Sequence, residues 1–187
     1  MSQATAAAGP VPEALPNIEF RVLLDSATLL HRVRELGTLI SRDYSGKDLV
    51  MVAILKGAQI FACDLLREVS VPVVIDFISI SRYKRSSETT GVRITRELEI
   101  DIRGRDVLII EDIVDTGLTL DFLTRRLKQR EPASVAICTL LDRPDLRLAE
   151  IPMRYVGFNV SEEFLVGYGL DYREQYRNLP FIAAIEV

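Results

Sequence analysis

The chain has 187 residues with a formal net charge of −4, and it contains one His, two Cys and no Trp. This length indicates one globular unit, because domains average roughly 150 residues, and a hydrophobic fraction of 48% supports a buried core. The uncharged stretch near residues 133–141, like every other in the chain, is far shorter than the roughly 20 apolar residues that cross a bilayer, so no membrane helix is expected. The mildly acidic total also argues against non-specific nucleic-acid binding, which needs a concentrated basic surface.

The N-terminal segment and the two cysteines indicate the compartment. The first sixteen residues lack both a basic n-region and an apolar h-region, so residues 1–17 predict a disordered tail rather than a secretory signal. Cys63 and Cys138 lie in apolar segments with no CxxC or Cys/His neighbourhood. This pattern favours buried thiols in a reducing compartment over a disulfide or a metal site. A cytoplasmic location is therefore expected.

The first half of the ordered chain predicts a βαβ unit after a helix. From Ser26 onward, apolar residues recur at three- and four-residue steps, which predicts an amphipathic helix with Ser26 as its N-cap. Residues 49–55 form a continuous apolar run rich in β-branched side chains, as expected for a strand covered on both faces. Residues 58–69 then show helical spacing, and residues 73–80 return to strand character.

The middle of the chain contains a polar loop. Residues 82–96 carry five basic residues against the single acid Glu88, a local charge of +4, which predicts an exposed loop. Alternating apolar residues from Val92 to Ile102 suggest an antiparallel ribbon attached to it. A strand at 107–110, a polar connector, a helix at 118–130 and a strand at 134–141 follow, with shorter strands near 155–158 and 181–185.

The alternation of strands and helices predicts an α/β fold, a parallel twisted sheet with helices on both faces. A single domain is expected over residues 18–187, because no repeat or second boundary is visible. Ligands of such sheets bind at the carboxyl ends of the strands. The polar strand ends are therefore where the site is expected.

The most informative run is EDIVDTGLTL, residues 111–120, at a predicted strand-to-helix junction. Free backbone N–H groups at a helix N-terminus favour phosphate, Gly117 permits close approach, and the Thr116 and Thr119 hydroxyls can donate to phosphate oxygens. The carboxylates of Glu111 and Asp112 would repel a phosphate unless sugar hydroxyls or Mg²⁺ intervened. A ribose 5-phosphate satisfies both conditions. The alternative interpretation is that the aspartates of this run merely cap a loop and a helix.

Residues 107–120, VLIIEDIVDTGLTL, resemble the phosphoribosyl pyrophosphate motif of type I phosphoribosyltransferases, and the Glu-Asp pair resembles their 6-oxopurine branch, the hypoxanthine-guanine phosphoribosyltransferases. The run Leu55-Lys56-Gly57 and residues 164–180, FLVGYGLDYREQYRNLP, also resemble that branch. The resemblance covers about residues 18–187. It implies the type I phosphoribosyltransferase fold, with a small hood from both termini that binds purine mainly through residues 143–187, and a flexible catalytic loop at about 81–96.

The resemblance also implies an activity, the transfer of a 5-phosphoribosyl group from phosphoribosyl pyrophosphate to N9 of hypoxanthine or guanine. Asp115 is the implied catalytic acid/base, facing purine N7. A non-proline cis peptide at Leu55-Lys56 is common in the family. The implied contacts to phosphoribosyl pyrophosphate are Lys56, Gly57, Glu111, Asp112, Asp115, Thr116, Gly117, Leu118, Thr119, Arg147 and Arg177.

The same resemblance implies a purine pocket and a Mg²⁺ site. Phe164 is expected to stack on one face of the base and Ile113 to press on the other, while Leu165 reads the base edge through its backbone. The implied metal ligands are Glu111, Asp112 and Asp171. The implied partners are the two small substrates, with neither nucleic acid nor membrane, and a homo-oligomer, either a dimer or a tetramer.

Two positions depart from the family pattern. Arg143 stands where the family usually has a Lys that donates to purine O6, and Arg presents a planar fork instead of a point charge. Arg82-Tyr83 stands where the catalytic loop commonly has Ser-Tyr. The preference among hypoxanthine, guanine and xanthine therefore stays open. The only histidine, His31, lies far from every motif, which disfavours a His base.

Two other classes remain as alternatives. One is another type I transferase, acting on xanthine, adenine or a pyrimidine. The other is a nucleotide-sensing regulator on the same fold that binds RNA or DNA. Such a regulator needs a basic face and no purine hood, whereas this chain is acidic overall and carries the 164–180 block.

Overall fold

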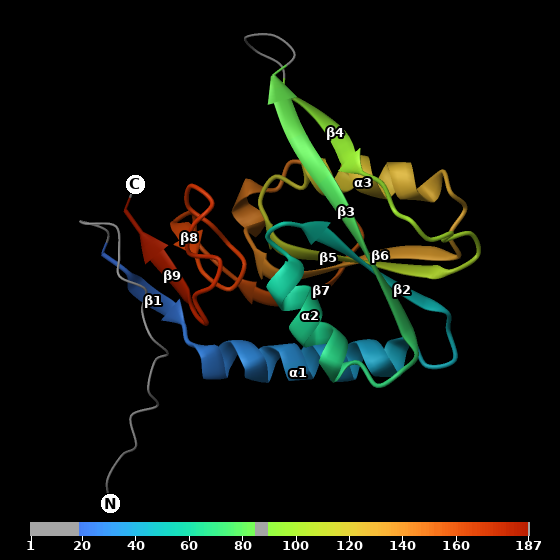
Figure 1. Ribbon diagram of the computed structural model, residues 1–187, viewed down its shortest axis with the longest axis horizontal. Helices are drawn as coiled ribbons and strands as arrows, with labels where there is room; N and C mark the ends of the chain where they lie inside the picture. Colours follow the sequence, from blue (N-terminus) through green and yellow to red (C-terminus); the bar gives the residue numbers. More distant parts are fainter. Residues whose placement is uncertain (1–18, 85–89, 187) are drawn as a thin grey trace, which may run out of the picture.

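The computed structural model describes residues 19–84 and 90–186, so the predicted tail 1–17 lies outside the described residues. Six strands of this part form a large sheet in the order β4-β3-β2-β5-β6-β7 (Figure 1). All neighbours in it pair in parallel except β4, which is antiparallel to β3. The strands are β2 (Leu49–Leu55), β3 (Val73–Lys84), β4 (Thr90–Arg96), β5 (Asp106–Val114), β6 (Ser134–Asp142) and β7 (Met153–Asn159).

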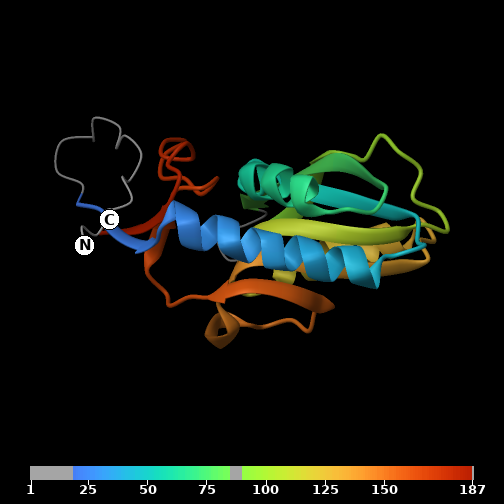
Figure 2. The same ribbon diagram turned by 90° about the horizontal axis from the view of Figure 1, so that it is seen from below.

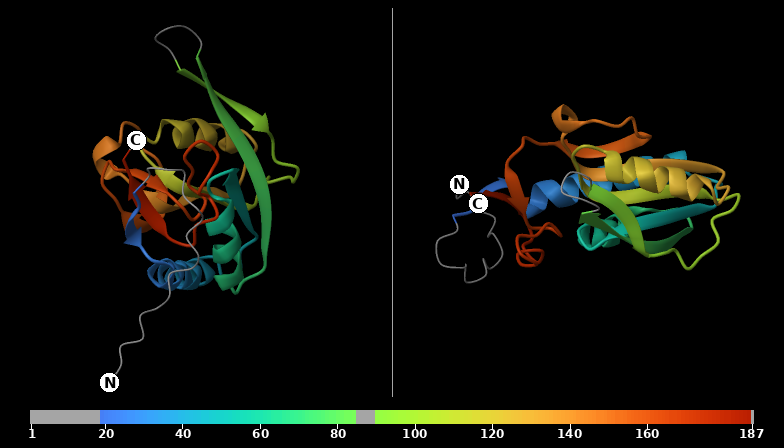
Figure 3. Two further views of the ribbon diagram at one scale, coloured as in Figure 1. Left: turned by 60° about the vertical axis from the view of Figure 1, so that its left-hand side comes forward. Right: turned by 90° about the horizontal axis from the view of Figure 1, so that it is seen from above.

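Helices cover both faces of this sheet, as the sequence predicts. Successive strand residues point to opposite faces, so Met51 and Ala53 pack with α1 (Ser26–Asp43) and α2 (Gln59–Glu68). Val50 and Val52 pack on the other side, with α3 (Leu118–Lys128). Figure 3 shows α1 and α2 on one side of the sheet and α3 on the other, and Figure 2 shows the face covered by α1. The central strands are therefore buried on both faces, which explains their uninterrupted apolar sequences.

A small antiparallel sheet lies beside the carboxyl ends of the large-sheet strands (Figure 1). It contains β1 (Arg21–Leu24), β9 (Ile182–Ile185) and β8 (Phe164–Val166), in that order. We call this sheet, together with residues 160–181 around β8, the hood. The short 3₁₀ helix η1 (Pro144–Leu146) follows β6. β7 falls within residues 143–187, yet it pairs with β6 and so belongs to the large sheet.

Two sequence expectations about single residues were wrong. The N-cap of α1 is Asp25, not Ser26, because the Asp25 carboxylate accepts a hydrogen bond of 2.7 Å from the Thr28 amide. Cys138 is buried on β6 as expected, but Cys63 is exposed. The helical period of α2 turns its neighbour Ala62 inward and places Cys63 on the solvent side, although the segment as a whole is apolar.

The polar segment 82–96 is more regular than a loop. β3 continues to Lys84 and pairs with β4, so the predicted antiparallel ribbon is present, with its tip, residues 85–89, outside the described residues. The expectation that the ribbon continues to Ile102 was wrong, because the strand ends at Arg96. Instead, the buried carboxylate of Asp76 on β3 accepts hydrogen bonds from the amides of Glu99 and Ile100, which fixes the chain below the ribbon.

Candidate active site

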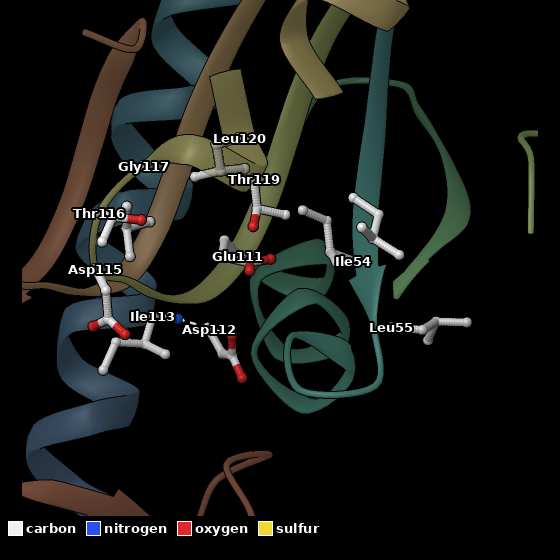
Figure 4. A pocket seen from close by; sticks show the side chains of 12 residues that line it. Ile54, Leu55, Glu111, Asp112, Ile113, Asp115, Thr116, Gly117, Thr119 and Leu120 are labelled. Atoms are coloured by element: carbon white, nitrogen blue, oxygen red, sulfur yellow. Dashed lines mark hydrogen bonds between the residues drawn. The ribbon is translucent and has the colours of Figure 1, made fainter. Parts of the chain in front are cut away.

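The run 111–120 lies at the carboxyl end of β5, which is the edge of the sheet where the sequence predicts the site. β5 extends to Val114, so the connector to α3 is only Asp115 to Gly117, shorter than the sequence suggests. Gly117 caps α3 with φ = +78°, a left-handed conformation that glycine adopts without strain. A cavity of about 260 Å³ opens at this point, and Figure 4 shows the side chains that line it. Its lining is Ile54, Leu55, Ile80, Glu111, Asp112, Ile113, Val114, Asp115, Thr116, Gly117, Thr119 and Leu120.

The phosphate loop, residues 115–119, is fixed from behind by the segment after η1. The backbone amides of Leu148 and Ala149 both donate to the Thr116 carbonyl, at 2.9 and 3.1 Å. The Thr116 side-chain oxygen accepts weakly from the Leu118 amide at 3.5 Å. These bonds hold the Thr116 carbonyl from behind, and the N-terminal turn of α3, which lines the cavity, is where helix amides favour an anion.

The second side of this site is the turn after β2. The Leu55-Lys56 peptide bond is cis, as the family resemblance implies. Gly57 follows it and lies against the Asp112 side chain so closely that a Cβ there would overlap the carboxylate. The pKa of Asp112 is raised to about 6, mainly by burial and to a smaller extent by the Asp171 carboxylate, against the lowering effects of the Ile113 amide and Arg177. An acid here is costly unless a cation or a donor faces it.

A second cavity, of about 320 Å³, adjoins the first and shares Asp112, Ile113 and Asp115 with it. It opens between the strand ends and the hood. Phe164 presents its ring there with 42% of the residue exposed, whereas Leu165 is buried. The complete lining is Asp112, Ile113, Asp115, Arg143, Glu162, Glu163, Phe164, Leu165, Leu170 and Asp171. The residues expected around the purine are therefore brought together, with Ile113 and Phe164 both at its wall.

The basic residues expected at the pyrophosphate fall into two places. Lys56 Nζ lies 2.9 Å from Glu174 Oε2, and Arg177 Nη2 lies 2.7 Å from Asp171 Oδ1 and 3.4 Å from the same Glu174 oxygen. These two cations therefore meet at one carboxylate of the hood. Arg147 lies instead behind the phosphate loop, where it pairs with Asp142 and contacts the position of Gly117. The lining of the two cavities does not include Arg147.

One expected pair of site residues lies outside the described side chains, and three contacts near the site were not expected. Arg82 and Tyr83 lie on β3 near the tip of the ribbon, and their side chains are outside the described part of the structure. Glu174 was missed by the sequence analysis, because nothing in the local sequence marks it as the partner of Lys56, 118 positions away. The carbonyls of Ser161 and Glu163, which bind Arg143, were missed for the same reason.

A mostly parallel sheet with a glycine-capped loop at the end of its central strand β5 and a hooded pocket beside it defines an α/β protein whose ligand site lies at the carboxyl ends of the strands. A model of the phosphoribosyl transferase domain matches residues 22–173. The chain therefore belongs to the phosphoribosyltransferase family.

The names of similar proteins agree with the resemblance to the 6-oxopurine branch of this family. The chain is 44% identical over 185 residues to the hypoxanthine-guanine phosphoribosyltransferase of Mycobacterium tuberculosis, covering 95% of this chain and 92% of the relative. It is 46% identical over 167 residues to the hypoxanthine phosphoribosyltransferase of Escherichia coli, covering 88% and 94%. The crystal structure of a hypoxanthine phosphoribosyltransferase from Staphylococcus aureus superposes with a TM-score of 0.85 at 46% identity, covering 89% of this chain and 91% of that chain.

The donor set at the site fits a hard divalent cation. Asp112 and Asp171 line the same cavity and interact unfavourably with each other, which a cation between them would reverse. Mg²⁺ typically takes one or two carboxylates and completes its shell with water and substrate phosphates. The third implied ligand, Glu111, lines only the first cavity, and within residues 19–84 and 90–186 no group of three or more His, Cys, Asp or Glu side chains gathers that could hold a metal. No helix of the same residues is long and apolar enough to cross a membrane.

Proposed function

We propose that this chain transfers the 5-phosphoribosyl group from phosphoribosyl pyrophosphate to N9 of hypoxanthine or guanine, giving IMP or GMP and pyrophosphate, as in purine salvage. One observation carries the proposal: Asp115 lines both the phosphate cavity and the hooded cavity beside it. A phosphoribosyl group in the first cavity and a base in the second would meet at this carboxylate. The names of the relatives in the 6-oxopurine branch point to the same reaction.

The phosphate loop binds the 5-phosphate in this proposal. Thr116, Gly117, Leu118 and Thr119 offer backbone amides and hydroxyls at the N-terminus of α3, where the helix dipole favours an anion. Glu111 and Asp112, near the carboxyl end of β5, accept hydrogen bonds from the ribose hydroxyls.

The pyrophosphate group lies towards the turn after β2. Lys56, Gly57 and Arg177 contact it there, and Arg147 adds positive charge from behind the phosphate loop. Glu111, Asp112 and Asp171 would hold Mg²⁺, and the bound cation would supply positive charge to the leaving pyrophosphate. Electrostatic stabilisation of the leaving group is the main contribution of these residues, because it acts where charge accumulates as the bond to C1′ breaks.

The purine lies in the hooded cavity between Phe164 and Ile113, with the Leu165 backbone at its edge and Arg143 near O6. As N9 bonds to C1′, the pyrophosphate departs with the electron pair of the broken C–O bond. Asp115 then accepts the purine proton from N7, which a carboxylate can do once positive charge has developed on the base. The ribbon that carries Arg82 and Tyr83 closes over the site and excludes water.

The remaining features of the proposal concern context. The chain acts in the cytoplasm on two small substrates and associates as a homo-oligomer, a dimer or a tetramer. A structure at 34% identity comes from a study of how the C-terminal region affects the oligomeric state of a Trypanosoma cruzi hypoxanthine phosphoribosyl transferase. Light scattering, which measures the mass of this chain in solution, distinguishes a dimer from a tetramer and both from a monomer.

The test is a parallel assay of hypoxanthine, guanine, xanthine and adenine with phosphoribosyl pyrophosphate and Mg²⁺. We expect turnover of the 6-oxopurines and rejection of adenine by roughly 10⁴-fold, because the adenine amino group would point a donor at Arg143. Efficient AMP formation, or transfer to none of the four bases, would contradict the proposal. Omission of Mg²⁺ with excess EDTA should abolish turnover with the preferred base.

A further inference from the structure

Arg143 makes more contacts than the reading of a purine oxygen requires. Its guanidinium donates to three acceptors in two segments of the chain: Nε to the Ser161 carbonyl at 2.9 Å, Nη2 to the Glu163 carbonyl, and Nη1 to Asp115 Oδ1 at 3.0 Å. Only 13% of the Arg143 side chain is exposed, against 41% for Asp115. The cation is therefore the fixed member of the pair, and the carboxylate is the member that it orients.

The backbone places Arg143 for this role. It follows the last residue of β6, and its amide donates to the Val114 carbonyl at 2.9 Å. Asp115 follows the last residue of β5, which pairs in parallel with β6. The two side chains thus leave neighbouring strand ends side by side. The carbonyls that anchor the guanidinium belong to residues 161–163, directly before Phe164 at the start of β8.

The following inference rests on the proposed function. We propose that Arg143 is a positioning residue, which holds the Asp115 carboxylate towards purine N7. It also links that carboxylate to the segment that carries the stacking ring of Phe164. A guanidinium has five N–H groups, of which three are used here. One N–H on each terminal nitrogen remains, so Arg143 can donate to O6 without releasing Asp115. A lysine has a single nitrogen and cannot span the three acceptors.

The test is a double-mutant cycle of Arg143→Lys with Asp115→Asn, measured as kcat at saturating hypoxanthine and phosphoribosyl pyrophosphate. If Arg143 acts through Asp115, lysine lowers kcat on the order of tenfold in the native background, because small misplacements of a reacting group are costly. In the Asp115→Asn background, Arg143→Lys should lower kcat less than about twofold, because the carboxylate through which Arg143 acts is already absent and the two substitutions are not additive. Equal losses in both backgrounds, or no loss in the native one, would overturn the inference.

A matched control and a structural measurement complete the design. Arg154→Lys changes an arginine that pairs with Asp43 at the other end of α1, and it should leave kcat unchanged. If Arg143→Lys fails to fold, as judged by its circular dichroism and thermal midpoint, Arg143→Gln takes its place in the cycle.

A crystal structure of the Arg143 variant tests the inference without relying on turnover. The Asp115 carboxylate in more than one rotamer supports the inference, whereas a single unchanged orientation contradicts it. Absence of transfer by the native chain is a different result, which contradicts the proposed function and leaves this structural readout in force.

Discussion

Two carboxylates at opposite ends of the molecule, Asp43 and Asp112, differ in their hydrogen-bond donors and in their pKa. At the end away from the hood, Asp43 closes α1 and accepts hydrogen bonds from Tyr155 at 2.9 Å, Arg154 at 3.0 Å and Arg42 at 3.0 Å. The hydrogen bond from Tyr155, followed by that from Arg42, holds the pKa of Asp43 below its usual range. Its ionised form therefore stabilises the folded protein.

At the hood end, Asp112 shows the opposite behaviour. Its pKa is raised to about 6, mainly by burial, so ionisation costs folding free energy that grows above about pH 4 and is complete above about pH 6. The comparison teaches that an unfavourable carboxylate marks the end of the sheet at which ligands are expected. A cation and sugar hydroxyls would supply what the protein itself supplies to Asp43. Three substitutions test this difference between the two ends of the molecule.

The largest effect is expected for Asp115→Asn at the hood end. Asparagine keeps the shape of the side chain but cannot accept the purine proton, so turnover should fall by roughly 10² to 10⁴. Binding of phosphoribosyl pyrophosphate, measured by titration calorimetry with Mg²⁺ present, should change little. Near-normal turnover in a steady-state assay would remove Asp115 from the mechanism.

The second effect concerns stability and its sign. In the folded state Asp112 has a pKa of about 6 against an unfolded value near 4, so its cost is absent below about pH 4 and complete above about pH 6. Asp112→Asn should therefore stabilise the metal-free protein by about 2 kcal/mol at pH 7.5. Urea unfolding in EDTA at pH 7.5 and at pH 4 measures this difference.

The same variant should bind substrate more weakly, which separates stability from function. If Asp112 faces ribose hydroxyls and Mg²⁺, its neutral analogue loses affinity for phosphoribosyl pyrophosphate while the free protein becomes more stable. A variant that is destabilised at pH 7.5 in EDTA would show that the Asp112 carboxylate supports the fold, as Asp43 does.

The parts of the fold and of the site that could be predicted from the sequence are those encoded by contiguous residues. The βαβ order, the buried strands and the phosphate loop follow from contiguous patterns, and the run 111–120 brings its own residues together wherever β5 ends. The family resemblance supplied the hooded pocket and the cis peptide at Leu55-Lys56, which the structure contains. Composition and periodicity by themselves indicate neither.

Contacts between distant segments could not be predicted in the same way. Arg143 was recognised as a departure, yet the sequence does not show that its fork is anchored by the Ser161 and Glu163 carbonyls. The partnership of Lys56 with Glu174 joins β2 to the hood and depends on tertiary packing. Cys63 shows the complementary error, because an apolar segment does not reveal which of its faces meets solvent.

The smallest effect is expected for Asp43→Asn at the far end of α1. Asparagine keeps an acceptor for Tyr155 but loses the charge that pairs with Arg42 and Arg154, which should cost about 1 kcal/mol of unfolding free energy at pH 7. Because the folded pKa of Asp43 lies below its unfolded value, the wild-type advantage is complete above about pH 4 and shrinks as the pH falls through the folded pKa. Urea unfolding at pH 7 and pH 3.5 checks the trend, with hypoxanthine turnover at pH 7.5 as the control. A difference of the same sign as for Asp112→Asn would contradict the contrast between the two ends, because it would mean that the fold leaves both carboxylates without adequate donors.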